Sequence, residues 1–252
     1  MLVDTQPATH QHLPASQEVR DQWVDAQLIG VLMDNAMPSL LSATLALPVM
    51  VYLMAGESNT LALVVWALVL MVLLAYRYRM IGIYRLQYDN MEGPMRMEFM
   101  RRYGWTWTAV GLCWGSSISL TFLQTSTLTQ FVCGLVVLGH GLISLTSFSA
   151  FLQVFKGYTH ALLGAVLVGI LLPVPLGLAG LAEAKLLASL VALLLIFWWL
   201  LQTAGERLHQ IHRSSFELQF SNQELIDSLT QQTRASLRAV ATKNRFLASA
   251  AH

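Results

Sequence analysis

Five long stretches without a charged residue constrain this chain more than any other feature of its sequence. They cover residues 35–56, 58–76, 103–155, 157–182 and 186–205. A helix needs roughly 20 apolar residues to cross the hydrocarbon core of a bilayer, and each stretch is about that long or longer. Charged residues make up only 12% of the chain, against roughly 25% in soluble domains. The sequence therefore predicts a membrane protein.

The apolar stretches predict an all-α, polytopic fold with six transmembrane helices. The stretch 103–155 is too long for one crossing, and the polar residues 124–127 divide it into two. We expect spans at about 36–56, 58–76, 104–123, 128–149, 158–178 and 184–203. Pro173 and Pro175 should kink or end the fifth span. The chain then has an N-terminal segment 1–35 that can include an interfacial helix, a membrane block 36–203 and a tail 204–252.

Nearly all lysines and arginines fall on one side of this six-span arrangement. That side holds the segment between spans two and three, the segment between spans four and five, and the tail, whereas the other side holds Lys185 alone. The preference of positive residues for the cytoplasm places both termini there. The external loops are then short. Residues 1–28 contain Arg20 as their one basic residue and lack an apolar core, so we expect no cleavable signal peptide.

Residues 78–102 mix arginines with methionine, isoleucine, tyrosine and phenylalanine. This mixture suits a short helix on the inner membrane surface, with arginine side chains at anionic headgroups and apolar side chains dipping inward. An ordinary basic loop that sets the topology explains the same composition, and both interpretations stay open.

Several classes of site are disfavoured. Cys113 and Cys133 both lie within apolar stretches, which argues against a disulfide framework, a CxxC redox motif and a cysteine-rich zinc site. His209 and His212 have helical spacing but no carboxylate cluster nearby, so no metal site is expected. A net charge of +1 argues against a nucleic-acid partner.

The tail has the pattern of one long helix. No proline or glycine occurs between Glu206 and His252. A heptad seam runs through Leu208, Ile211, Ser215, Leu218, Asn222, Leu225 and Leu229, and a seam displaced by one position continues through Leu237, Val240, Asn244 and Leu247. Since a single helix cannot bury such a stripe, we expect a cytoplasmic coiled coil that pairs two copies in a parallel homodimer.

Residues 243–252, KNRFLASAAH, resemble the start of the H-box of bacterial sensor histidine kinases. In that family a basic or polar residue, Phe, Leu or Ile, Ala and small residues precede the phosphoacceptor histidine, although Ser is more common where Ala251 stands. The resemblance implies that His252 is the phosphoacceptor, whose imidazole attacks the γ-phosphate of ATP held with Mg²⁺ by a separate catalytic domain. The phosphoryl group then passes to an aspartate of a response regulator or receiver domain.

This resemblance implies the input part of a two-component phosphoprotein in the bacterial inner membrane. The ATP-binding domain is not in the sequence, so the chain itself should need no cofactor and should not phosphorylate itself. Because the chain stops inside a helix, we expect that it is cut from a longer protein. Its short external loops, multispan block and direct entry into a kinase helix also resemble, more loosely, the hybrid kinases that detect diffusible fatty-acid signals in quorum sensing.

The most unusual apolar stretch is rich in hydroxyl and amide groups at the outer junction of spans three and four. These groups could bind the headgroup of a small amphiphile, and we select Ser116, Ser119, Thr121, Leu123, Gln124 and Leu128 as ligand-binding candidates. Hydrogen bonds within the helix or to a neighbouring helix are the alternative. His140, between two glycines in span four, is a further candidate, against a neutral histidine that bonds a neighbouring helix. Gly111 and Gly115 form a GxxxG pattern that favours close helix packing.

Three functions compete. The sequence favours a homodimeric sensor that detects an amphiphilic signal in the bilayer and relays it through the tail to His252. A small transporter or channel would show paired intramembrane charges or inverted repeats, and only Asp34 and the Pro-Val-Pro of span five hint at these. A membrane-bound hydrolase would need clustered His, Asp or Glu at membrane depth, where His140 stands alone.

Overall fold

The structure, a computed structural model, describes residues 14–87, 91, 93–122, 125–172 and 181–250; of 14–16, 181–183 and 242–250 it describes the backbone only. The elements in these ranges are α1 (Pro14–Met54), α2 (Thr60–Gln87), α3 (Gly93–Tyr103), α4 (Trp105–Phe122), α5 (Thr127–Phe148), α6 (Leu152–Leu171) and α7 (Leu181–Ala250). The all-α class is therefore confirmed for the described part of the chain.

Five of these helices are long and apolar enough to cross a membrane. They are α1, α2, α5, α6 and the first part of α7, and together they indicate a membrane protein. The helix α4, which corresponds to the predicted third span, is not among the five. Its 18 residues include glycines, serines and threonines, which lower its mean hydropathy.

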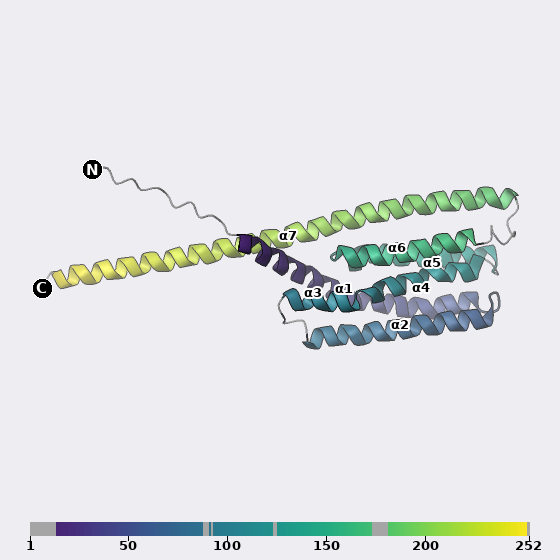
Figure 1. Cartoon of the computed structure of the whole chain (residues 1–252), viewed down its shortest axis with the longest axis horizontal. Coiled ribbons are helices and arrows are strands. Elements are labelled where there is room, and N and C mark those ends of the chain that lie inside the picture. Colours follow the sequence, from purple (N-terminus) through teal and green to yellow (C-terminus); the bar gives the residue numbers. More distant parts are fainter. Residues whose placement is uncertain (1–13, 88–90, 92, 123–124, 173–180, 251–252) are drawn as a thin grey trace.

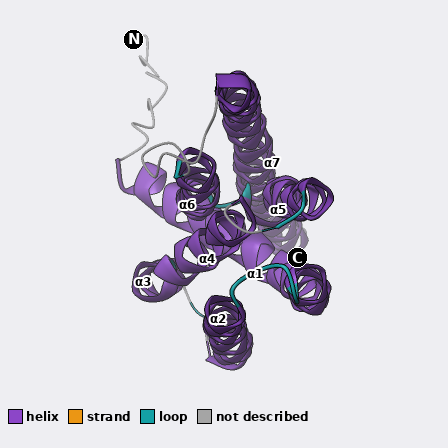
Figure 2. Cartoon of the chain, turned by 90° about the vertical axis from the view of Figure 1, so that its right-hand side faces the viewer, coloured by secondary structure: helices purple, strands orange, loops and turns teal. Residues whose placement is uncertain are grey.

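The position of α4 explains its composition, because α4 lies at the centre of the bundle with the other helices around it (Figure 2). Ten of its residues are buried, including Trp107 and Trp114, both with no exposed surface. A helix that contacts protein on most sides needs small residues for close packing more than it needs the aliphatic residues that face lipid.

The closest packing joins α4 to α6 through the GxxxG pattern. A Cβ atom at Gly111 would lie 2.5 Å from the carbonyl oxygen of Tyr158, and one at Gly115 would overlap the carbonyl oxygen of Leu162. From the other side, a Cβ at Gly169 would lie 2.9 Å from the backbone nitrogen of Ser119. The two backbones thus touch at positions where only glycine leaves room, as the pattern predicts.

The connections between helices are short. Gly56 has a φ of 82° and turns the chain after α1. Asn59 then accepts a hydrogen bond of 3.0 Å from the backbone nitrogen of Ala62 and so caps α2. Helix α6 ends at Leu171, before Pro173, as expected for a residue that cannot continue a helix; Pro173 and Pro175 themselves lie outside the described residues.

Several predicted boundaries lie inside helices. Residues 14–35 of the predicted N-terminal segment continue into the first span as one helix, α1, which contains Pro38 and Pro48. Residues 78–87 prolong α2, so only 93–103 of the predicted surface segment form a separate helix, α3. Arg96 holds α3 against α1, because its Nη1 donates a 3.2 Å hydrogen bond to the carbonyl oxygen of Ala26.

Helix α7 leaves the bundle without a break. It packs along α6, passes the beginning of α1 and extends far beyond the other helices (Figure 1). We call the end of the bundle that holds Glu57 and Ser126 the loop end, and the opposite end, where α3 lies and from which α7 projects, the arginine end.

Candidate functional site

The hydroxyl groups of the predicted ligand region mostly bond within their own helix. Ser116 Oγ donates to the carbonyl oxygen of Cys113 at 2.8 Å, and Thr121 Oγ1 donates to that of Ile118 at 3.0 Å. Thr121 is fully buried and Ser119 is half-buried, whereas Leu128 is 73% exposed. Leu123 and Gln124 lie outside the described residues. The structure therefore gives Ser116 and Thr121 local hydrogen bonds within α4, and the role of all six candidates in binding a ligand stays a prediction.

At the loop end, Glu57 joins two connections that are distant in the sequence. Its carboxylate accepts hydrogen bonds from the backbone nitrogen of Ser126 at 2.9 Å and from Ser126 Oγ at 3.3 Å. Ser126 is the N-cap of α5, so the carboxylate lies at the positive end of that helix. The backbone hydrogen bond from Ser126 and the side-chain bond from Thr129 hold the pKa of Glu57 below its usual value. The sequence gives no local signal for this contact.

His140 belongs to an aromatic cluster in the middle of the bundle. Its ring stacks on Trp114, with centroids 4.0 Å apart, and Trp114 meets Trp66 edge to face at 6.0 Å. The Nδ1 atom of His140 lies 2.9 Å from the carbonyl oxygen of Val136, while Nε2 is buried and has no hydrogen-bond partner among the described residues. The observed contact therefore stays within α5 and does not reach a neighbouring helix, and the role of His140 in binding stays a prediction.

Helix α7 contacts α6 where it leaves the bundle. Gly205 lies directly against the ring of Phe155, because a Cβ there would overlap that ring. About one turn before Gly205, Gln202 Nε2 donates to Thr159 Oγ1 at 2.7 Å. Directly after Gly205, Glu206 pairs with Lys156 of α6 at 2.7 Å. These contacts fix the position of α7 at the arginine end.

A second set of contacts joins α7 to the beginning of α1. Arg213 reaches Asp21 at 3.1 Å and Asp25 at 3.4 Å, and it also pairs with Glu217 on its own helix at 3.0 Å. Trp23 lies between these acidic residues on α1. Its ring packs on two rings of α7, with centroid distances of 6.3 Å to Phe216 and 5.5 Å to Phe220. We call this set of residues the α1–α7 latch.

The latch uses the face of α7 opposite to the heptad seam. Phe216 and Phe220 lie two positions on either side of Leu218, which places each about 160° from it around the helix. The seam residues stay exposed: Ile211 is 62%, Leu218 63%, Leu225 58% and Leu229 53% exposed. One face of α7 is therefore docked on the bundle, and the apolar face has no partner within this chain's described residues.

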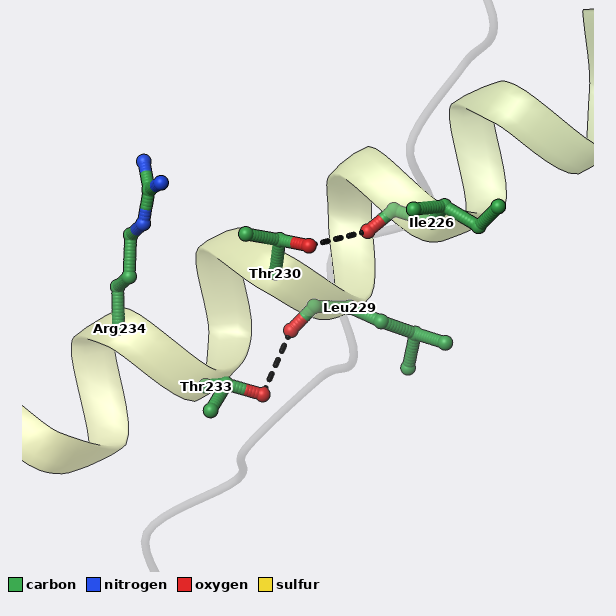
Figure 3. Close-up of a pocket in the computed structure, with 5 residues that line it drawn as sticks. All are labelled: Ile226, Leu229, Thr230, Thr233 and Arg234. Atoms are coloured by element: carbon green, nitrogen blue, oxygen red, sulfur yellow. Dashed lines mark hydrogen bonds between the residues drawn. The ribbon is translucent and has the colours of Figure 1, made fainter.

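Figure 3 shows a shallow hollow on this exposed part of α7, and all its lining residues come from the same helix. Thr230 Oγ1 donates to the carbonyl oxygen of Ile226, and Thr233 Oγ1 donates to that of Leu229, each at 2.8 Å. The hydroxyl groups are thereby satisfied, which leaves the side chains of Ile226 and Leu229 as an apolar surface. A surface of this kind, formed by one helix alone, is suited to packing against another helix.

Among the residues that the structure describes, no group of three or more His, Cys, Asp or Glu is arranged to hold a metal ion. The Nδ1 atom of His209 lies 3.0 Å from the carbonyl oxygen of Ala150, in the turn that follows α5. His252 lies outside the described residues, although the helix that leads to it is present up to Ala250.

Comparisons with known protein families, with curated proteins and with solved structures find no match to this chain.

Proposed function

We propose that this chain is the membrane input region of a bacterial two-component sensor kinase. Six helices would cross the inner membrane, including α4 at the centre of the bundle, with both termini in the cytoplasm. A small amphiphilic signal would alter the packing of the bundle, and α7 would carry the change toward His252.

The observation that carries this proposal is the continuity of α7. One helix of 70 residues begins in the apolar bundle and ends in a polar tail. Since a helix transmits rotation and translation along its axis, a shift of its first half moves its second half as well. The H-box resemblance lies at the end of that second half.

The exposed seam supports a parallel dimer as the signalling state. A second copy of α7 can cover Leu218, Leu225 and Leu229 while the α1–α7 latch stays closed, because the latch and the seam lie on opposite faces. Asn222 lies within the seam, where one polar residue fixes the register of a coiled coil. A ligand that prefers one of two bundle packings would shift the population of the dimer states by its difference in affinity.

Disulfide cross-linking tests this dimer. In a cysteine-free background made by Cys113→Ala and Cys133→Ala, we expect Leu225→Cys to form a disulfide-linked dimer in membranes, since the seam would bring the two copies together. Asp227→Cys is the matched control, because residue 227 lies two positions away and points about 200° around the helix. Equal cross-linking of both variants, or cross-linking of neither, would contradict the dimer seam.

The transporter alternative has less support. Asp34, the acidic residue near the start of the first predicted span, is exposed on α1 and is not buried in the bundle. Uptake of a solute into vesicles that contain the purified chain, absent from empty vesicles, would favour this alternative over the sensor.

A further inference from the structure

A buried arginine at the arginine end has an unused hydrogen-bonding edge. Arg77 on α2 is only 2% exposed. Its guanidinium carbon lies 4.7 Å from the ring centroid of Trp107 on α4 and 5.5 Å from that of Phe148 on α5. Its Nε and Nη2 atoms are buried, and no residue in the described part of the chain forms a hydrogen bond with them.

The charge of Arg77 is not compensated by the described residues. No carboxylate pairs with it there, and the titratable group that interacts with it electrostatically is Tyr158, a phenol that is neutral at pH 7. Contacts with aromatic rings recover part of the cost of burying a cation, but that cost is larger than such contacts supply. A bound anion would therefore stabilise the buried guanidinium of Arg77.

The two unused atoms indicate which kind of anion would fit. Nε and Nη2 lie on the same edge of the guanidinium plane and donate two parallel N–H bonds, the arrangement that binds a carboxylate or a phosphate with two oxygens. Two further buried donors also lack a partner among the described residues: Trp107 Nε1, on the ring that the guanidinium covers, and Ser149 Oγ, on the residue that follows Phe148 in the chain.

The depth of Arg77 indicates what carries the anion. It is 17 residues after Thr60, so it lies about 26 Å along α2 from the loop end. Because the hydrocarbon core is about 30 Å thick, the guanidinium lies near the level of the opposite headgroups. The partly exposed rings of Tyr76 and Trp105, 6.2 Å apart, lie next to it, as aromatic residues do at a membrane interface.

We infer that Arg77 binds the anionic headgroup of an acyl amphiphile, whose chain lies in the hydrocarbon core. The headgroup is either the carboxylate of a fatty acid or the phosphate of a membrane lipid. The role of this site in signalling rests on the proposed function. A chain of contacts links the site to α7: Phe148 packs on Tyr158 of α6, with centroids 5.0 Å apart, and the Phe155 ring of α6 touches α7 at Gly205. Binding at Arg77 therefore acts on helices that contact the output helix.

Binding of dodecanoate to the purified chain in detergent, measured by titration calorimetry, tests the carboxylate source. We expect Arg77→Gln to weaken binding about tenfold or more, since the two-donor edge is lost. Arg77→Lys should weaken it less, because a lysine keeps the charge but not the paired donors. Arg79→Gln is the matched control, because Arg79 is an exposed arginine two residues along α2 and its loss should leave the affinity unchanged. Dodecanol, with the same chain and no charge, should not distinguish the variants.

Native mass spectrometry of the chain from nanodiscs of phosphatidylglycerol or phosphatidylcholine tests the lipid source. Retention of phosphatidylglycerol by the wild type and by Arg79→Gln, and its loss from Arg77→Gln, would assign the site to a lipid phosphate. Dodecanoate binding and lipid retention that are both unchanged in Arg77→Gln would overturn the inference.

Thermal melting separates a binding role from a structural one. Without amphiphile, Arg77→Met should melt at the same temperature as the wild type or higher, because it removes an uncompensated buried charge. A lower melting temperature in detergent, with no dodecanoate-induced rise in the wild type, would mean that Arg77 serves packing alone.

If dodecanoate binds through Arg77 but leaves the Leu225→Cys cross-link unchanged, the anion site stands and its role as signal input fails. If binding through Arg77 occurs and that cross-link never forms, the proposed dimer fails instead.

Discussion

Single atoms decide how close α4 and α6 can come. The carbonyl oxygen of Leu162 and the Cβ of Ala165 occupy the space that a side chain at Gly115 would need, the latter at 2.8 Å. Neither a backbone carbonyl nor a Cβ atom can move without moving its helix. The cost of a methyl group here therefore falls on the packing of the whole helix pair.

We expect Gly115→Ala to lower the free energy of unfolding by about 1–3 kcal/mol, the usual cost of overpacking a close helix contact. Gly164→Ala on α6 is the matched control, because nothing lies within 4 Å of a Cβ atom there. This control should be neutral or stabilising by up to about 1 kcal/mol, since alanine favours the helix over glycine. Melting of both variants in the same detergent gives the comparison, and equal melting temperatures would show that the α4–α6 contact is looser than described.

At the scale of helices, the α1–α7 latch is where the helix bundle holds the projecting helix α7. Its ion pairs are partly exposed, with the Arg213 side chain 36% exposed, so each contributes little on its own. The rings of Trp23, Phe216 and Phe220 add an apolar contact beside the charges. The latch is therefore strong enough to favour one position of α7 and weak enough to open.

We expect Arg213→Ala to weaken the latch by about 1 kcal/mol, because it removes both charge contacts between α7 and α1. Amide hydrogen exchange over residues 17–25 should then become roughly fivefold faster. The exposed Arg207, which lies on the same helix and carries the same charge, gives the control variant Arg207→Ala. A faster exchange in both variants would point to general destabilisation of α7 and not to the latch.

The sequence predicts the helices better than their ends and contacts. Uncharged stretches mark where a helix crosses lipid, but a helix can continue past a charge, as α2 does through Arg77 and Arg79 to Gln87. The GxxxG pattern correctly predicted the close contact between α4 and α6, because its two glycines are four residues apart and so lie on one face of the same helix. Glu57 and Ser126 are 69 residues apart, and Arg213 and Asp21 are 192 apart, so no periodicity in the sequence links them. The candidate residues on α4 were chosen for their polar groups, which the helix itself largely satisfies.

For the molecule as a whole, the two ends of the bundle differ in charge. The loop end holds Glu57 and Lys185, whereas the arginine end holds α3 with Arg96, Arg101 and Arg102. The helix α4 connects the two ends although its hydropathy is lower than that of its neighbours, because it is shielded from lipid by the helices around it (Figure 2). In the proposed six-span arrangement, the side on which the α4–α5 connection lies would show whether α4 crosses and in which direction.

Cysteine labelling in intact cells tests the six-span topology and the orientation together. In the Cys113→Ala, Cys133→Ala background, Asn59→Cys and Thr127→Cys should react with a membrane-impermeant maleimide from outside the inner membrane, since both positions lie at the loop end. Glu98→Cys on α3 and Gln219→Cys on α7 should react only after the membrane is permeabilised, because the distribution of positive residues predicts that the arginine end faces the cytoplasm. All four positions are exposed in the structure, so a lack of reaction reflects the membrane and not burial.

Labelling of Thr127→Cys only after permeabilisation, with Asn59→Cys labelled from outside, would show that α4 does not cross and would refute the six-span arrangement. Labelling of all four with the sides reversed would keep the six spans and invert the orientation, placing His252 outside the compartment that contains ATP.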